Sequence, residues 1–285
     1  MANSQLTIKG RLKGLINSYF PSLTKSEQKV AEIVLEEMEK VMYFSVTDLA
    51  DAADVGDTTV LRFCRKVGFK GYQEFKLAIA KDLANGTGTP GEDPDEAGGI
   101  LQAIARNTVN VIQETAAITN EEVLEDALIL LDEANSIHFF GVGTSGLTAL
   151  DAENRLLRIG KRTHAVIDSH IQAMTAATLG EGDVVVGISV SGSTKDTIDS
   201  LKIAEDSGAT VIAITHHARS PITKVANLVL LSGGKESPLE GGSLAAKISQ
   251  LFVIDLLCTG IAIRNKKKSL EFKERTARAV INKIY

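Results

Sequence analysis

The sequence predicts two domains of different class: an all-α domain built around a helix-turn-helix, then an α/β domain with a five-stranded parallel sheet. Apolar residues recur at helical spacing over residues 45–75. Residues 85–99 hold five Gly, two Pro and no large apolar side chain, as in a linker. Beyond residue 136, short apolar runs alternate with amphipathic stretches, as strands alternate with crossover helices. We therefore expect domains at residues 1–84 and 100–285.

The second helix of the predicted helix-turn-helix presents one apolar stripe. Its members, spaced i, i+3, i+4 and i+7, are Val60, Phe63, Cys64 and Val67. The preceding helix, residues 46–53, begins after Ser45, which is a favourable N-cap. Only residues 54–56 separate the two helices, which suits the tight turn of a DNA-binding motif. Asp54 takes the place of the usual turn glycine, and aspartate is among the few residues that tolerate left-handed backbone angles.

The polar face of this unit is basic. Residues 57–81 contain six Lys or Arg against two Asp or Glu. A surface helix can carry such an excess as a solvated face, but the charge and the spacing together favour DNA. Residues expected to face DNA are Thr58, Thr59, Arg62, Arg65 and Lys66, with Lys70 and Tyr72 touching phosphates.

Residues 23–83 resemble the N-terminal domain of the RpiR family of bacterial transcriptional regulators. The family pattern is T-V-x-R-F-x-[RK] followed by G-[FY]-x-G-[FY]-x-x-F. The matching residues are Thr59, Val60, Arg62, Phe63, Arg65, Gly68, Phe69, Gly71, Tyr72 and Phe75. Residues 23–31 fit the opening helix of that domain. The resemblance implies a regulator that binds DNA through this unit.

The second half reads as an α/β layer. Helices are expected at residues 100–117 and 121–134, with Thr119 and Glu122 forming a capping box for the second. The expected strands are residues 137–140, 163–167, 184–189, 211–215 and 228–231. A final apolar helix at residues 242–263 contains Lys247, Gln250 and Asp255, which favour a packing or dimer helix over a membrane span.

The loop after the first expected strand carries Gly141, Gly143 and Gly146 in a G-x-G-x-x-G pattern at the start of a helix. Asp168, 22 residues beyond Gly146, could hold a ribose hydroxyl, so an NAD-dependent enzyme is an alternative.

The loop after the third strand distinguishes the alternatives. Four hydroxyls surround Gly192 at a helix start, supplied by Ser189, Ser191, Ser193 and Thr194. Free N–H groups at a helix N-terminus, together with short hydroxyl donors, suit a phosphate monoester. One Ser/Thr-Gly loop is commonly an ordinary turn; two such loops at carboxyl ends of strands favour a phosphorylated ligand.

Residues 100–284 resemble the SIS (sugar isomerase) domain, whose signature is a G-x-G-x-S loop and an S-x-S-G-x-[ST] loop. The resemblance implies a phosphosugar ligand. The phosphate and sugar contacts carried over are Gly143, Thr144, Ser145, Ser189, Ser191, Ser193 and Thr194, with Glu240 as a weaker candidate for a sugar hydroxyl.

A SIS-type isomerase or lyase is a second alternative, since proton transfer beside a carbonyl needs a placed Glu or His. Glu153, His216 and His217 are the candidates. An ion pair with Arg155 or Arg158 explains Glu153 more simply, and paired histidines after a strand are more often part of a turn. The sequence therefore favours a regulator without catalytic residues.

Composition limits the remaining classes. A net charge of −5 argues against uniform binding of polyanions, so any DNA affinity is local. Cys64 and Cys258 lie in apolar stretches of different domains, which predicts buried thiols and no metal site. Residues 1–10 lack the apolar core of a signal peptide. We expect a cytoplasmic homodimer or homotetramer that binds a palindromic double-stranded operator and a phosphosugar effector, with no cofactor and no membrane.

Overall fold

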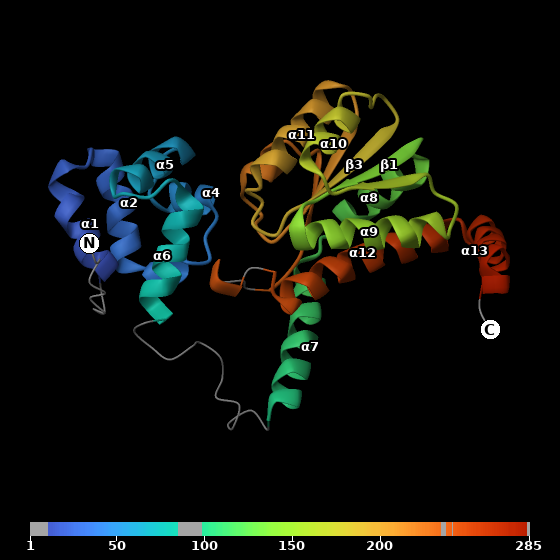
Figure 1. Cartoon of the computed structure of the whole chain (residues 1–285), viewed down its shortest axis with the longest axis horizontal. Helices are drawn as coiled ribbons and strands as arrows, with labels where there is room; N and C mark the ends of the chain where they lie inside the picture. The colour runs from blue at the N-terminus through green and yellow to red at the C-terminus, as the bar shows by residue number, and fades with distance from the viewer. Residues whose placement is uncertain (1–10, 85–98, 235–237, 241, 284–285) are drawn as a thin grey trace. The chain divides into compact units, whose positions relative to one another are not determined.

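The computed structural model of the chain describes residues 11–84, 99–234, 238–240 and 242–283 (Figure 1). Contacts divide the chain into two compact units, residues 1–107 with 235–243 and residues 108–234 with 244–285. Apart from Gly99, the expected linker lies outside the described residues, so its boundaries stay a prediction.

The first unit is all-α, as predicted. Its elements are α1 (Arg11–Tyr19), η1 (Phe20–Ser22), α2 (Lys25–Glu36), α3 (Met38–Val41), α4 (Val46–Ala52), α5 (Asp57–Lys66) and α6 (Tyr72–Ala84). They share one apolar core in which the predicted stripe is fully buried: Val60, Phe63, Cys64 and Val67 are each at most 1% exposed. Helical periodicity therefore placed the inward face of α5 correctly.

The turn between α4 and α5 follows the expected geometry. Ser45 caps α4 in a reciprocal box: its hydroxyl accepts from the Asp48 N–H at 3.0 Å, and Asp48 Oδ2 accepts from the Ser45 N–H at 2.8 Å. Asp54 adopts φ of 52°, the left-handed conformation anticipated for the turn. Gly56 is the N-cap of α5 and offers no side chain to cap it.

The second unit is an α/β layer with all five predicted strands. They are β1 (Ser136–Phe140), β2 (Thr163–Val166), β3 (Asp183–Ile188), β4 (Thr210–Thr215) and β5 (Leu228–Leu231). All pair in parallel in the order β2-β1-β3-β4-β5. The chain therefore reverses its direction of winding between β1 and β3.

Helices cover both faces of this sheet (Figure 1). On one face, α8 (Glu121–Glu133), α9 (Gly143–Leu157) and α12 (Leu244–Arg264) enclose the larger apolar core. On the other face lie α10 (Ser169–Ala176) and α11 (Lys195–Asp206). The remaining elements are α7 (Ile100–Ile118), α13 (Lys266–Val280) and the 3-10 turns η2 (Pro221–Lys224), η3 (Pro238–Glu240) and η4 (Ile281–Lys283).

Helix α12 is long and apolar enough to cross a membrane by length and composition. Val253, Ile254 and Leu257 on this helix are at most 2% exposed and belong to the core over the sheet. The packing role predicted from its interior polar residues is therefore confirmed.

One predicted cap was wrong. Asn120, not Thr119, caps α8, because Asn120 Oδ1 accepts from the N–H groups of Glu122 and Val123 at 2.9 and 3.2 Å. The Thr119 hydroxyl instead donates at 2.7 Å to the carbonyl of Thr115, in the last turn of α7. Helix α13 was not predicted at all, because it has few apolar residues to mark a buried face.

Candidate functional sites

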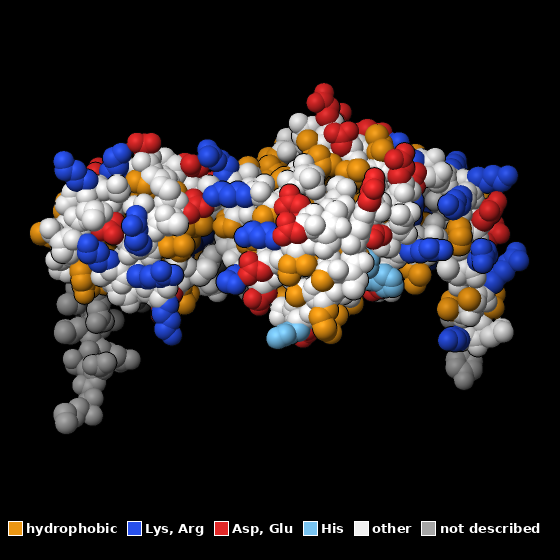
Figure 2. Space-filling view, turned by 90° about the horizontal axis from the view of Figure 1, so that it is seen from above, with side chains coloured by type: hydrophobic (Ala, Val, Ile, Leu, Met, Phe, Trp, Pro, Cys, Tyr) orange, Lys and Arg blue, Asp and Glu red, His pale blue; other side chains and the backbone are white. Residues whose placement is uncertain are grey.

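Helix α5 presents a basic polar face. Thr58, Arg62 and Arg65 are exposed, as predicted. Thr59 is the exception: it is 7% exposed and its hydroxyl accepts from the Arg62 guanidinium at 3.3 Å. The prediction that Thr59 faces DNA is therefore corrected, since it lies beside the buried stripe and positions Arg62 instead. Figure 2 shows Lys and Arg side chains standing out from the surface of the first unit.

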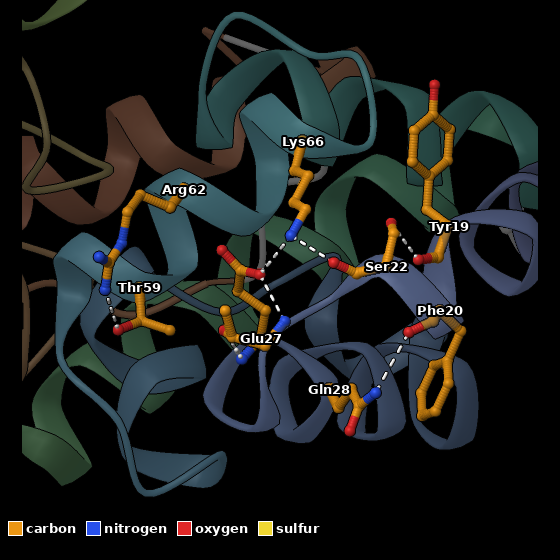
Figure 3. Close-up of polar contacts among 9 residues, drawn as sticks. Tyr19, Phe20, Ser22, Glu27, Gln28, Thr59, Arg62 and Lys66 are labelled. Atoms are coloured by element: carbon orange, nitrogen blue, oxygen red, sulfur yellow. Dashed lines mark hydrogen bonds and ion pairs between the residues drawn. The ribbon is translucent and has the colours of Figure 1, made fainter.

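Lys66, at the last turn of α5, is only partly available (Figure 3). Its ammonium lies 3.1 Å from Glu27 Oε2 and donates to the carbonyl of Ser22 at 2.5 Å. Glu27 is 6% exposed and also closes the N-terminal capping box of α2 with Thr24. Lys66 therefore ties α5 to the start of α2 and fixes the orientation of the basic face.

Tyr72 is also corrected. It is 4% exposed, and its hydroxyl donates to the carbonyl of Phe44 at 3.1 Å. Burial raises its pKa well above the usual value, so the phenol stays neutral. Tyr72 cannot contact a phosphate from this position because it belongs to the core beneath α6. Lys70, two residues earlier, is exposed and remains a candidate phosphate contact.

The second candidate site lies at the carboxyl ends of β1 and β3, where the sheet order switches direction. The loop after β1 leads through α9 to β2, and the loop after β3 leads through α11 to β4 on the opposite side. In open α/β sheets, ligands bind in the crevice that such a divergence opens. Both predicted hydroxyl-bearing loops lie at this crevice.

The first loop is tightly folded onto the start of α9. A Cβ on Gly141 would lie 2.9 Å from the backbone of Ser145, so only glycine fits there. Ser145 is 7% exposed and its hydroxyl accepts from the Gln250 amide at 3.2 Å. Gln250 in turn accepts from the Thr148 hydroxyl at 2.9 Å. The loop is thus held by the first turns of α12.

Lys247 is a further candidate for this site; its place in the sequence predicted only a role in helix packing. Its ammonium donates to the carbonyl of Thr144 at 2.7 Å and to the Thr148 hydroxyl at 2.8 Å. Burial lowers its pKa, partly opposed by Asp151. The sequence feature that could have indicated this role is a lysine in the first turns of a long apolar helix that follows a glycine-rich segment. Its charge lies directly beside the first loop.

The second loop is shaped by Gly192, which has φ of 60°. A Cβ there would lie 2.1 Å from the hydroxyl oxygen of Ser220. The Ser189 and Thr194 hydroxyls lie 3.0 Å apart, and the Ser191 hydroxyl accepts from the Ser193 N–H at 3.3 Å. The four predicted hydroxyl residues are therefore brought together.

The N-terminus of α11 opens onto this loop. Thr194 is its N-cap residue, yet the Thr194 side chain makes no capping hydrogen bond. The first N–H groups of α11 therefore lack a side-chain acceptor, and they carry the positive end of a twelve-residue helix. Backbone donors and neighbouring hydroxyls together can bind an oxyanion such as phosphate.

Glu240 is not brought to these loops by any described contact. It ends the turn η3, which groups with the first unit, and its side chain lies outside the part of the chain that the structure describes. Its predicted sugar contact stays a prediction.

Asp168, the acid of the dinucleotide alternative, caps a helix in the structure. Its carboxylate accepts from the Ile171 N–H at 3.0 Å and caps α10, so it serves the protein backbone. The strand order also differs from the 3-2-1-4-5-6 order of dinucleotide-binding sheets. The glycines of the G-x-G-x-x-G pattern instead allow the first loop to pack closely against the start of α9.

Glu153 and His216, candidate bases of the isomerase alternative, differ in their surroundings from what the sequence predicted. Glu153 forms no ion pair within the described residues; the expected partner Arg155 pairs with Asp255 and Asp151. His216 Nδ1 lies 2.5 Å from the Ser232 hydroxyl, and burial lowers its pKa to about 4. His216 is therefore a neutral imidazole held between β4 and β5.

No group of three or more His, Cys, Asp or Glu that could hold a metal ion occurs among the described residues. Cys64 and Cys258 are buried free thiols, and burial raises the pKa of each to about 12. Neither thiol is a thiolate at neutral pH.

Two family profiles match the chain. One, described as the helix-turn-helix domain of the rpiR family, matches residues 11–86. The other, described as the SIS domain, matches residues 130–260. Each covers one of the two candidate sites.

Whole-chain similarity extends to regulators. An HTH-type transcriptional regulator of Haemophilus influenzae is 37% identical over 279 residues, covering 95% of this chain and 97% of the relative. The HTH-type transcriptional regulator HexR of Pseudomonas aeruginosa is 35% identical, with 87% and 88% covered. The structure of the Vibrio vulnificus NanR protein complexed with ManNAc-6P superposes with a TM-score of 0.88 at 29% identity, covering 96% of this chain and 100% of NanR.

Proposed function

The chain belongs to the rpiR family of helix-turn-helix transcriptional regulators, and we propose that its SIS domain binds a phosphosugar that controls DNA binding by the helix-turn-helix. The observation that carries the proposal is the uncapped N-terminus of α11 beside the hydroxyls of Ser189, Ser191, Ser193 and Thr194. Such an arrangement favours a ligand that carries a phosphate over a neutral sugar.

Lys247 supports the same ligand from the other side of the crevice. Its ammonium is partly desolvated and donates to neutral oxygens of Thr144 and Thr148. A phosphate or ring oxygen near it would gain a charge-assisted hydrogen bond. The structurally similar NanR is complexed with ManNAc-6P, which makes amino-sugar phosphates the first ligands to test.

The DNA-binding face that we propose consists of Thr58, Arg62, Arg65 and Lys70, which are exposed, with Lys66 partly engaged by Glu27. A homodimer or homotetramer would present two such helices to a palindromic operator, about 34–36 Å apart for successive major grooves. A ligand that shifts this spacing would change affinity, and the site would operate in the cytoplasm. The named whole-length relatives are regulators, which supports a sensing role over catalysis.

A thermal-shift screen of the full chain tests the effector. We expect stabilisation by one member of a panel of hexose, hexosamine, pentose and muramic acid phosphates. The double variant Ser191→Ala with Ser193→Ala should lose that stabilisation. Ser207→Ala is the matched control, because the Ser207 hydroxyl only donates to the carbonyl of Ile203 at the end of α11. Stabilisation by NAD, or by the panel in the double variant, would contradict the proposal.

A further inference from the structure

A second hollow lies in the α/β unit, at the opposite ends of α9 and α12 from the two loops. It is a groove of about 630 Å³ between α9, α12 and α13. That volume lies within the range of small-molecule sites. Its lining includes Arg158, Ile159, Ile263, Lys266, Ser269 and Lys273. None of these residues belongs to the effector site described above.

Three cations in this groove have no acidic partner. Arg158, Lys266 and Lys273 are exposed, and none of them forms an ion pair among the described residues. Arg155, which also lines the groove, is already paired with Asp255 and Asp151. The groove therefore holds positive charge that the protein itself does not neutralise.

The surrounding helix reinforces this charge. Residues 264–283 contain eight Lys or Arg and two Glu, a net charge of +6 in a chain of −5 overall. Figure 2 shows Lys and Arg side chains gathered over the α13 end of the molecule. Because the rest of the chain is acidic, this concentration is a local feature and not a consequence of composition.

Ser269 supplies a second, independent observation. The residue is 4% exposed and lines the groove, and its N–H donates to the carbonyl of Asn265 at 2.8 Å. Its hydroxyl makes no hydrogen bond to any described residue. The hydroxyl lines the groove and is open to water there, so it is available to a ligand that binds beside the three cations.

The groove is also apolar on one side. Ile263 is 70% and Leu270 56% exposed, and both line it. Exposed large apolar side chains beside unpaired cations suit a ligand with an anionic head and an apolar body. A bare inorganic ion would leave those side chains in water.

We propose that the groove between α9, α12 and α13 is a second ligand site, for a small oxyanion that carries an apolar group. Arg158, Lys266 and Lys273 would pair with the oxyanion, Ser269 would donate to it, and Ile263 and Leu270 would cover the apolar part. Both α9 and α12 extend from this groove to the effector loops, where they carry Ser145 and Lys247. A ligand here would therefore contact the two helices that hold the first loop.

Binding is tested by isothermal titration with 1-naphthyl phosphate, using the full chain with Ser191→Ala and Ser193→Ala to silence the effector loops. We expect saturable binding of one ligand per chain. Two related compounds test the two parts of the ligand separately. 1-Naphthoate shows whether a carboxylate can replace the phosphate. Inorganic phosphate, which lacks the apolar group, should bind much more weakly than 1-naphthyl phosphate. Neutral 1-naphthalenemethanol should not bind.

Lys266→Gln with Lys273→Gln should weaken 1-naphthyl phosphate at least about tenfold, since two charge-assisted contacts are lost. Lys267→Gln with Lys268→Gln is the matched control, because these lysines lie on the same helix outside the groove lining. Equal loss in both variants, or no saturable binding in the host, would overturn the proposal. Two further results would also overturn it if the Ser191→Ala, Ser193→Ala protein binds no ligand. A changed molecular mass of the Lys266→Gln, Lys273→Gln variant would mean that the groove binds a second copy of the chain. A reduced salt dependence of its DNA binding would mean that the groove binds nucleic acid.

Discussion

Lys66 Nζ lies 3.1 Å from Glu27 Oε2, joining the last turn of α5 to the first turn of α2 across 39 residues of sequence. The carboxylate is nearly buried, while the lysine is about one third exposed. Burial opposes ionisation of Glu27, but hydrogen bonds from Thr24 and Lys66 and the lysine charge together lower its pKa. Lys66 was expected to contact DNA, but its ammonium instead fixes the orientation of α5, the helix that would contact DNA.

Lys66→Met should destabilise the first unit by about 1–2 kcal/mol, because Glu27 would lose the cation that pairs with it among the described residues while staying nearly buried. Since the Glu27 pKa is lowered on folding, the stabilisation is present above its ordinary value of 4.5 and is lost as pH falls through the folded-state value. The difference between variant and wild type should therefore shrink as the pH falls below 4.5. Urea unfolding across pH measures it, with the exposed Lys70→Met as control; equal effects of both variants would rule out the ion pair as the cause.

Arg62→Ala with Arg65→Ala should reduce operator affinity at least about a hundredfold and lower the salt dependence, since each arginine would contribute about 1–3 kcal/mol. Their exposure predicts that the fold is unaffected. The matched control is Lys13→Ala with Lys81→Ala, which removes the same charge from exposed positions of the same unit. Fluorescence anisotropy with operator DNA is the measurement, and undiminished binding would remove α5 from the interface.

The sequence predicted features that depend on local periodicity. The buried stripe of α5 follows from 3.6-residue spacing, and the five strands follow from short apolar runs between turns. The sequence did not predict contacts between distant segments. A lysine at the start of a long apolar helix marks Lys247 as unusual, but it does not indicate that its ammonium meets the carbonyl of Thr144, 103 residues away. Tyr72 was misplaced for the same reason, since its hydroxyl partner Phe44 lies 28 residues earlier.

Gly192→Ala should disrupt the second loop. The alanine Cβ would meet the Ser220 hydroxyl at 2.1 Å in a backbone conformation that already disfavours side chains. We expect a loss of about 2–3 kcal/mol in stability and of effector binding. Gly208→Ala is the matched control, because Gly208 lies in the same unit outside the effector loops, has a positive φ of 96°, and an added Cβ would come no closer than 3.6 Å to another atom. It should show only the backbone cost of about 1 kcal/mol; equal losses would mean that the contact with Ser220 does not matter.

Lys247→Met should weaken the phosphosugar about tenfold or more while the protein stays folded, because it removes a charge beside the first loop but preserves the aliphatic stem. Lys247→Arg should retain part of the affinity. Since burial lowers the pKa of Lys247, wild-type affinity should also decline at alkaline pH earlier than an ordinary lysine would predict. Calorimetric titration at several pH values checks both effects, and a Met variant with wild-type affinity would exclude Lys247 from the site.

His216 should make stability depend on pH between about 6.5 and 4. Burial lowers its pKa from 6.5 to about 4, so in this window the unfolded chain binds a proton that the folded chain does not. Stability should therefore fall as pH drops from 6.5 towards 4, by up to about 3 kcal/mol from this residue. His216→Asn, which cannot be protonated in this range, should flatten the profile, and His170→Asn at an exposed position is the control for replacing a histidine. His138, whose pKa burial also lowers, should contribute to the slope that remains. Chemical unfolding at half-unit pH steps gives the profile, and a slope unaffected by His216→Asn would place the titrating group elsewhere.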